Sequence, residues 1–364
     1  MSKPLFRDLW KFDSVTRSWS KIKTEGVHPE QLASHSATYF RDHLIVYGGT
    51  GVPFGQSSSN KIHSCNLRTG VWQWLRPQNV DDNQVPTDQY GQAVVVDNES
   101  GCLYAIGGTT GFRYTIDVYK FNLFTRRWTL LWKRPDSDHD QFPEERYRHE
   151  IVLYNNQIYV FGGGTASVCY GFKFIPVFDL STNKWIKLKS NPRNSKSAIP
   201  AARKCHGCVK TSTDQVYIMG GSDGALIFKD IWKFDLKRST WQKIAVEMPT
   251  PLYFHGMAIS PVGKVTIFGG VYRIMANQLD TNVRTNDLHE VWLEVPPLEE
   301  LAWIAFVTFC QSCDLTACSR LQLAELGVPT KFINRLSFMQ LPSSRSIKSL
   351  TSADDVSRSL PEPS

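Results

Sequence analysis

The side chains best able to bind a metal ion or to do redox chemistry are four histidines and two Cys-x-x-Cys pairs. The histidines are His35, His149, His206 and His255, with Tyr90-Gly91 at the corresponding place of one further segment, and the pairs are Cys205-Cys208 and Cys310-Cys313. A zinc site needs its nitrogen and sulfur ligands to meet at one point. Each histidine, however, belongs to a different repeated segment, so we expect a recurring structural hydrogen bond and predict no metal.

The cysteine pairs lie where a shared ligand is not favoured. Cys205 and Cys208 fall on a predicted strand, whose alternation sends them to opposite faces, and Cys310 and Cys313 fall in an apolar helical stretch. No glycine-rich phosphate loop, Ser-His-Asp order with a nucleophile elbow, or paired-carboxylate signature stands out. We therefore predict free thiols, no cofactor and no catalytic residues.

Five diglycines organise the chain. They are Gly48-Gly49, Gly107-Gly108, Gly162-Gly163, Gly220-Gly221 and Gly269-Gly270, and the tryptophans that follow them by about twenty residues are Trp72, Trp128, Trp185, Trp241 and Trp292. Each diglycine ends a short run of β-branched and aromatic residues, which predicts a buried strand. Glycine allows the chain to turn and approach closely near a crowded axis, and tryptophan supplies an apolar plate that seals neighbouring units.

A period of roughly fifty residues with Gly-Gly and a late tryptophan resembles the kelch repeat, which forms one four-stranded blade of a β-propeller. The resemblance implies full repeats at about residues 35–76, 90–133, 148–190, 204–246 and 254–294. Residues 7–26 match only the second half of a blade, because residues 8–13 and Trp19 nearly repeat residues 230–241. We therefore expect an all-β propeller of six blades over residues 1–294, with an incomplete first blade. Since no sixth diglycine follows Trp292, we expect either a shortened product of a longer gene, which we favour, or a first blade that is completed unconventionally.

Composition agrees with one large domain. The chain has 364 residues, 41% of them hydrophobic, and its net charge of +7 comes without a block of lysine or arginine, so nucleic-acid binding by bulk charge is not favoured. No apolar run is long enough for a membrane helix or a signal peptide. These features predict a protein of the cytoplasm and nucleus that does not bind membranes.

Strand-like sequence stops after Trp292. Pro296-Pro297 introduces an apolar helical run over residues 298–313, and a second helical stretch is expected over residues 315–326, ending at Gly327. A short helix that is apolar on nearly every face must be enclosed by protein. We therefore expect a helical segment at residues 296–340, followed by a serine-rich disordered tail at residues 341–364.

This helical segment resembles the elongin-binding and cullin-2 boxes of cullin-RING substrate receptors. The elongin-box pattern is carried by Leu298, Ala302 and Phe306, and the cullin-2 box by Val328, Pro329, Phe332 and Leu336. Residues four apart lie on one helix face, and the family uses such a face as a helix in a groove. With the propeller before it, the chain resembles the kelch-domain-containing subfamily of cullin-2 ubiquitin-ligase receptors.

The resemblance implies that the helices bind elongin B/C and cullin-2 and that the propeller captures substrate proteins by their C-termini. A bidentate contact from arginine distinguishes a terminal carboxylate from an internal peptide. Candidates in loops after the diglycines and between blades are Arg113, Arg146, Arg148, Arg203 and Arg273, with Tyr147 and Tyr272 as apolar walls. The family's own carboxylate-binding loop nominates Arg113 and Arg273.

Two alternatives remain beside this receptor hypothesis. A non-ligase scaffold would use the propeller to bind and regulate a signalling protein such as a kinase or phosphatase. A kelch copper oxidase would need a Tyr, Cys and His constellation in a secreted protein, and neither feature is expected here.

Overall fold

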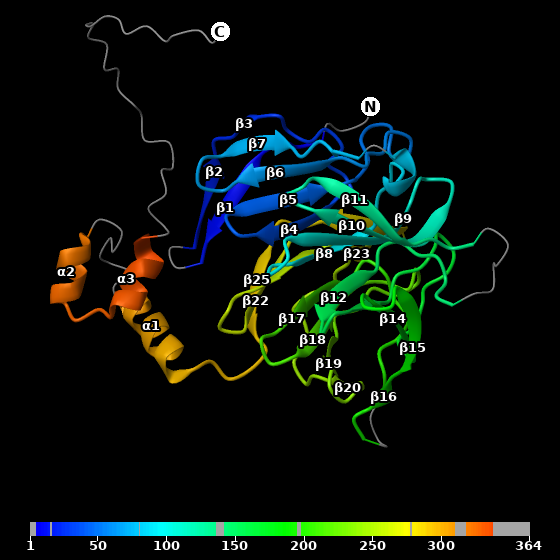
Figure 1. Ribbon diagram of the computed structural model, residues 1–364. Coiled ribbons are helices and arrows are strands. Elements are labelled where there is room, and N and C mark those ends of the chain that lie inside the picture. The colour runs from blue at the N-terminus through cyan, green and yellow to red at the C-terminus, as the bar shows by residue number, and fades with distance from the viewer. Residues whose placement is uncertain are drawn as a thin grey trace, which may run out of the picture. The chain divides into compact units, whose positions relative to one another are not determined.

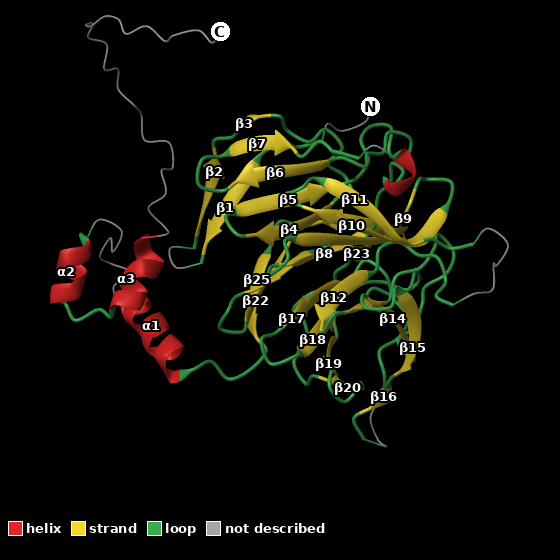
Figure 2. Cartoon of the chain, in the orientation of Figure 1, coloured by secondary structure: helices red, strands yellow, loops and turns green. Residues whose placement is uncertain are grey.

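The computed structural model describes residues 5–14, 17–79, 81–135, 142–194, 198–276, 279–309 and 318–337. The chain divides into two compact units, one of Met1–Arg7 with Thr24–Phe306 and the other of Asp8–Lys23 with Val307–Ser364. Strands make up nearly all of the regular structure of the first unit (Figure 1; Figure 2).

The first unit contains five antiparallel sheets that follow one another along the chain. Their strands are β4 (Ser36–Phe40), β5 (His43–Tyr47), β6 (Ile62–Asn66) and β7 (Val71–Trp74); β8 (Ala93–Asp97), β9 (Cys102–Thr109), β10 (Tyr114–Asn122) and β11 (Arg127–Trp132); β12 (Glu150–Tyr154), β13 (Gln157–Phe161), β14 (Phe174–Asp179) and β15 (Lys184–Lys189); β17 (Gly207–Lys210), β18 (Gln215–Met219), β19 (Ile231–Asp235) and β20 (Thr240–Lys243); and β21 (Gly256–Ile259), β22 (Lys264–Phe268) and β25 (Leu288–Trp292).

Shorter elements complete the unit. The two-residue strands β3 (Glu25–Gly26) and β16 (Asn191–Pro192) add to the outer edges of the first and fourth sheets, and the hairpin β23 (Val271–Ala276) and β24 (Leu279–Arg284) leaves the fifth. A 3-10 turn, η1, spans Asp82–Gln84. Inner strands of successive sheets contact one another in the order β4, β8, β12, β17 and β21. These are five blades of a β-propeller; the predicted ring of six is not confirmed.

The diglycines act as predicted. Both residues of each pair have positive φ, and a Cβ added to Gly162 would lie 2.6 Å from the carbonyl oxygen of Arg203 in the next blade. In four of the five pairs the N–H of the second glycine donates to a carbonyl of the next blade: Gly49 to Gln89, Gly108 to Arg146, Gly163 to Arg203 and Gly221 to Leu252, at 2.8–2.9 Å. Only glycine fits so close an approach of two backbones.

Three of the tryptophans seal neighbouring blades. Trp128, Trp185 and Trp241 lie on fourth strands, and their rings pack against Tyr47, Trp132 and Phe161 of the preceding blade at centroid distances of 5.4–6.0 Å. Trp72 holds the same place on β7 and is also buried. The predicted role is confirmed for Trp128, Trp185 and Trp241, whose ring contacts cross from one blade to the next.

The prediction for Trp292 is wrong, because this residue lies on a third strand. Trp292 pairs with Lys264 of β22, as Asp235 pairs with Gln215 in the fourth blade. In the other blades the third strand ends in Asn66, Asn122, Asp179 or Asp235, whose side chain accepts two backbone N–H groups of the following turn. Such side chains favour turns. Trp292 has no such acceptor, and the fifth sheet has no fourth strand among the described residues.

The repeated histidines pack between blades as expected, but through van der Waals contact with a glycine rather than through the predicted hydrogen bond. A Cβ on Gly107 would meet His149 at 2.6 Å, and His206 and His255 lie in the same way over Gly162 and Gly220. In the second repeat Gln92 takes this place, rather than Tyr90-Gly91, and its amide donates to the Tyr47 carbonyl at 2.8 Å. The imidazoles of His206 and His255 have no hydrogen-bond partner in the described part of the chain. At this level of the propeller the hydrogen bonds to the next blade come from the diglycine N–H groups and from Gln92.

The second unit contains the N-terminal hairpin of β1 (Leu9–Asp13) and β2 (Ser18–Ile22). Its register pairs Phe12 with Trp19 and Asp13 with Ser18, matching Phe234 with Trp241 and Asp235 with Thr240 in the fourth blade. The predicted half-blade is therefore formed as a two-stranded sheet, and no further described strand pairs with it.

Three helices follow the propeller: α1 (Leu298–Phe309), α2 (Arg320–Glu325) and α3 (Thr330–Ser337). The second expected helix begins at Arg320 rather than at residue 315, because Ser319 and Gln322 form a capping box at its start. Residues 310–317 and the tail lie outside the described residues, as do Cys310 and Cys313. No described helix is long and apolar enough to cross a membrane.

Candidate functional site

Loops from all five blades meet at the end of the propeller where the second strands finish. Five residues at equivalent positions, Ser34, Gly91, Arg148, Cys205 and Phe254, all have positive φ. Their backbones form a chain of hydrogen bonds from blade to blade, in which Gly91 donates to Ser34, Arg148 to Gly91, Cys205 to Arg148 and Phe254 to Cys205, at 2.7–3.1 Å. This arc links the first blade to the fifth.

Arg148 is the charged member of this arc. Its guanidinium donates to the Ser34 hydroxyl and lies 4.6 Å from the ring centre of Phe254 and 5.8 Å from that of Tyr147. Burial lowers the pKa of Arg148, and this effect is partly opposed by the neighbouring Cys205, Tyr147 and Tyr90. Within the described ranges no carboxylate forms an ion pair with Arg148. A half-buried cation without a counter-ion is suited to bind an anion.

Aromatic and basic side chains surround Arg148. The rings of Tyr147 and Tyr114 meet edge to face at 5.2 Å, and the Tyr114 hydroxyl accepts the Ala166 N–H at 2.9 Å. The Lys204 ammonium donates to the Thr165 carbonyl at 2.6 Å and lies 5.8 Å from the Tyr147 ring centre. Tyr147 therefore forms an apolar wall beside Arg148, and the Lys204 ammonium places a second cation close to the same ring.

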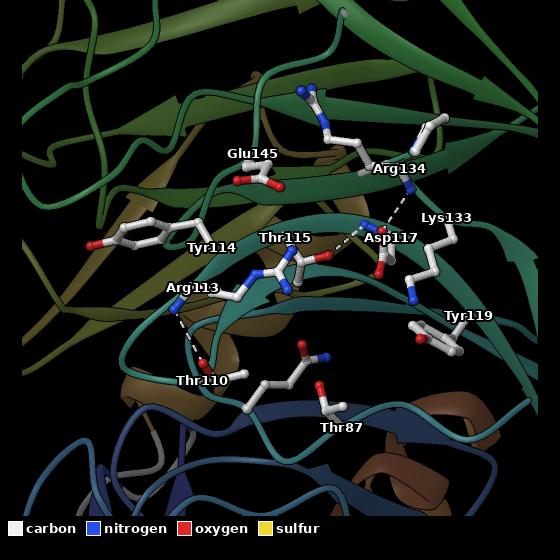
Figure 3. A pocket seen from close by; sticks show the side chains of 12 residues that line it. Thr87, Thr110, Arg113, Tyr114, Thr115, Asp117, Tyr119, Lys133, Arg134 and Glu145 are labelled. Carbon is white, nitrogen blue, oxygen red and sulfur yellow. Dashed lines mark hydrogen bonds between the residues drawn. The ribbon is translucent and has the colours of Figure 1, made fainter. Parts of the chain in front are cut away.

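A polar cavity of about 460 Å³ opens beside the second blade (Figure 3). Its lining includes Arg113, Lys133, Asp117, Glu145 and Tyr114. Figure 3 shows the Arg113 side chain extending across the cavity toward Thr115. Burial raises the pKa of Asp117, against the opposing charges of Lys133 and Arg113. The cavity can therefore bind a polar group of mixed charge.

Arg146 and Arg203 do not fit the predicted role of carboxylate ligand, because both are buried inside the blades. Arg146 donates to the Gly162 carbonyl at 3.0 Å and to Glu144 at 2.8 Å, and burial lowers its pKa to about 10. Arg203 donates to the Gly220 carbonyl at 2.9 Å and to both oxygens of Asp230. Each arginine thus donates to the carbonyl of the first glycine in its own repeat.

The remaining predicted residues lie at the fifth blade. Arg273 is exposed on β23 and donates to the Ala225 carbonyl of the fourth-blade loop at 2.9 Å. Tyr272 packs instead against the apolar core of the last two blades. The structure therefore brings Arg148 and Tyr147 together, and leaves Arg113 and Arg273 in separate loops.

Every repeat also carries an exposed apolar side chain shortly after its diglycine that was not predicted from the sequence; four lie in loops and the fifth lies on β23. These residues are Phe54 (58% exposed), Phe112 (89%), Val168 (47%), Leu226 (62%) and Ile274 (40%). Each follows the second glycine of its repeat by four or five positions, and this spacing could have revealed them. Exposed apolar side chains on the loops of a propeller are suited to contact a peptide or protein partner.

The predicted elongin-binding face is accessible on α1. Leu298 is 82% exposed, Ala302 is exposed and Phe306 is half-buried. The Phe306 ring contacts that of Trp303, which is 3% exposed, at a centroid distance of 5.8 Å. The enclosure expected for this helix is thus partial.

In the predicted cullin-2 box, the side chains of Val328 and Phe332 are buried and Pro329 is exposed. Leu336 lies on α3, but its side chain is outside the described set. Among the three box residues whose side chains the structure describes, Pro329 is the exposed one.

Residues 2–163 and 129–296 match the family described as the KLHDC2/KLHL20/DRC7 Kelch-repeats domain. The chain is thus a kelch-repeat β-propeller protein.

Similarity to whole proteins defines the family further. The chain is 41% identical to human kelch domain-containing protein 10 over 92% of its own length and 72% of that protein, and 40% identical to the Xenopus laevis protein over 92% and 77%. The Drosophila melanogaster homolog is 37% identical over 91% of this chain and 56% of that protein. The chain belongs to the kelch domain-containing protein 10 family.

Proposed function

We propose that this protein is the non-catalytic substrate-recognition subunit of a cullin-2/elongin B/C ubiquitin ligase, acting in the cytoplasm and nucleus. The observation that carries the proposal is the exposed face of α1, where Leu298 is 82% exposed and Ala302 and Phe306 follow at helical spacing. Burying a leucine of this kind in a partner's groove contributes about 1.5–3 kcal/mol. A small residue one turn later lets the partner approach closely.

The propeller would hold the substrate. Its loop face places the Arg148 guanidinium, which has no carboxylate partner in the described structure, among Tyr147, Ser34 and Phe254. A peptide's terminal carboxylate supplies the missing negative charge, and its last side chains would contact the apolar loop tips. Charge-assisted hydrogen bonds of this type contribute about 1.5–3 kcal/mol.

The first experiment tests the ligase half of the proposal. The variant Leu298→Asp should lose co-purification with elongin B/C, and with it cullin-2, because a charge replaces the apolar anchor. The control is Leu226→Asp, which changes another exposed leucine (62%, against 82% for Leu298) on a propeller loop and should retain elongin B/C. If Leu298→Asp still binds elongin B/C, the ligase proposal is refuted.

The second experiment tests the substrate half. The propeller should bind peptides with free C-termini roughly 10- to 100-fold more tightly than the same peptides with amidated C-termini. Arg148→Gln should remove this difference in affinity. The variant Arg113→Gln is the comparison, since it changes the separate cavity of the second blade. Equal binding of free and amidated peptides would contradict a carboxylate site.

A non-ligase scaffold is the second candidate function. The exposed apolar loop tips favour binding of a protein partner, such as a kinase or phosphatase, whether or not a ligase is recruited. Purification of the protein with a signalling partner but without elongin B/C would support this function over the first.

A further inference from the structure

One position on the loop face of the propeller carries a charge where other repeats carry tyrosine. In each repeat, the residue just before the member of the backbone arc forms an isolated β-bridge to the residue that follows the diglycine. The five residues at this position are Ala33, Tyr90, Tyr147, Lys204 and Tyr253. Three repeats build the same bridge with tyrosine, so the architecture does not require the Lys204 charge.

The Lys204 ammonium is held in place without a counter-ion. It donates to the Thr165 carbonyl at 2.6 Å and to the Ala166 carbonyl at 3.2 Å. The Tyr114 hydroxyl accepts the Ala166 N–H at 2.9 Å, so the loop that holds the ammonium is itself fixed. Among the described residues no carboxylate forms an ion pair with Lys204. An ammonium has three N–H donors, which leaves one donor and the positive charge for a ligand.

Lys204 and Arg148 form one site with two positive charges. Each cation lies 5.8 Å from the centre of the Tyr147 ring, so the two are separated by no more than twice this distance. Both also act on the Cys205 thiol. Burial raises the pKa of that thiol to about 12, and the charges of Arg148 and Lys204 oppose the shift. The two cations therefore surround the same ring and the same thiol.

The acidic side chains near this pair do not neutralise it. Asp223, in the loop after the fourth diglycine, uses one carboxylate oxygen to accept the N–H groups of Ala225 and Leu226 at 2.9 and 2.7 Å. Glu150 lies near the Cys205 thiol, but burial raises the pKa of Glu150 to about 8. Its carboxyl is therefore mostly uncharged at neutral pH. A half-buried pair of cations in such surroundings favours a ligand with two negative charges.

We propose that this site recognises two negative charges near the C-terminus of a substrate, with the terminal carboxylate at Arg148 and an aspartate or glutamate side chain at Lys204. The acidic subsite rests on the function proposed above and adds a substrate class to it. An extended chain spans at most about 3.3–3.6 Å per residue, so the limit on the separation of the two cations places the acidic residue among the last three. The single remaining donor of Lys204 suits a carboxylate oxygen better than the three acceptor oxygens of a phosphate.

Peptide pools test this subsite on the full-length chain. Each pool contains ten-residue peptides with free C-termini, random except that one of the last three positions is glutamate, glutamine, lysine or phosphoserine. Bound peptides are counted by mass spectrometry. The wild-type protein should enrich glutamate over its uncharged isostere glutamine by roughly tenfold at one of the three positions.

Variants of Lys204 separate its charge from its packing. Lys204→Met should remove the preference for glutamate, Lys204→Arg should keep it, and Lys204→Glu should reverse it in favour of lysine. Damage to the fold cannot produce this reversal. The matched control is Lys210→Met in the same blade. Lys210 also lies 5.8 Å from a tyrosine ring, that of Tyr154, but it has a carboxylate partner, Asp214, at 3.6 Å. The control should keep the preference for glutamate.

Three results would overturn the acidic subsite. The first is equal enrichment of glutamate and glutamine by the wild-type protein at all three positions. The second is a preference for glutamate that survives Lys204→Met. The third is a tenfold enrichment of phosphoserine over glutamate, which would assign the site to a phosphate.

The acidic subsite and the proposed function can fail separately. Equal binding of glutamate and glutamine by a protein that still prefers free over amidated C-termini would refute the subsite alone. A glutamate preference that persists in amidated peptides and disappears in Lys204→Met would support the subsite, although the carboxylate site at Arg148 would then be refuted.

Discussion

Replacing Arg203 with methionine should strongly destabilise the propeller. Its guanidinium is 0% exposed and donates to both oxygens of Asp230, at 2.5 and 3.0 Å, and to the carbonyls of Gly220 and Ala201, at 2.9 and 3.1 Å. Methionine leaves the Asp230 carboxylate, 16% exposed, with only the Trp232 indole N–H at 2.7 Å. Removing one partner of a buried ion pair costs about 3–5 kcal/mol.

Denaturant unfolding followed by tryptophan fluorescence measures this loss, as a lower midpoint at an unchanged slope. The control is Arg238→Met, which removes an ion pair of similar length, 3.0 Å to Asp235, from a side chain that is 77% exposed. Exposed pairs contribute only about 0–1 kcal/mol. The two variants therefore separate the effect of burial from that of charge.

The pH dependence gives a second readout. Burial alone would raise the pKa of Asp230, but the hydrogen bonds and charge of Arg203 outweigh it and lower the pKa. This stabilisation is present above the unfolded-state pKa, about 3.9, and is lost as pH falls through the lower pKa of the folded state. Arg203→Met should lose this acid-range dependence. A loss of stability below about 1 kcal/mol, equal to that of Arg238→Met, would refute the reasoning.

Three further predictions concern the propeller. In Gly220→Ala the new Cβ would meet a carbonyl oxygen at 2.5 Å, whereas Gly224, which also has positive φ, has open space around it. Gly224→Ala should therefore lower the unfolding free energy by about 1–2 kcal/mol, and Gly220→Ala should lower it clearly more. Equal losses would show that the contact at residue 220 is relieved. Burial raises the pKa of Glu150 to about 8, so stability should fall as pH rises from about 4.3 to 8, and Glu150→Gln should flatten this profile in denaturant titrations; an unchanged profile would contradict it. Ser190→Ala leaves the Trp241 indole N–H without its 3.1 Å acceptor and should lower the melting temperature through a loss of roughly 1–3 kcal/mol, whereas no shift would mean that water replaces the hydroxyl.

The repeat architecture could be predicted because its signals are local and recur. A strand that ends in two glycines carries its own reason for turning, and the structure confirms this at Gly162, where a side chain would collide with the next blade. Four tryptophans were placed correctly for the same reason. Spacing failed at Trp292, since distance along the chain does not reveal which strand is the hydrogen-bonding partner.

The arginines show what local sequence does not contain. Arg146 and Arg148 are two positions apart in one loop, yet Arg146 is enclosed by Gly162 and Glu144, and Arg148 extends to Ser34 of the first blade and Phe254 of the fifth. The positive φ of Arg148 and the backbone arc around it set this direction. Neither feature is written in the residue types.

The sequence by itself determined the blades, the half-blade at the N-terminus and the accessible helix pattern of Leu298, Ala302 and Phe306, because each depends on residues close together in the chain. Only the tertiary structure decided which cations face solvent, that no described strand follows β25 in the fifth sheet, and that Ser34, Tyr147 and Phe254 meet at Arg148. Burial and strand pairing are set by residues from distant repeats, which meet only when the blades pack.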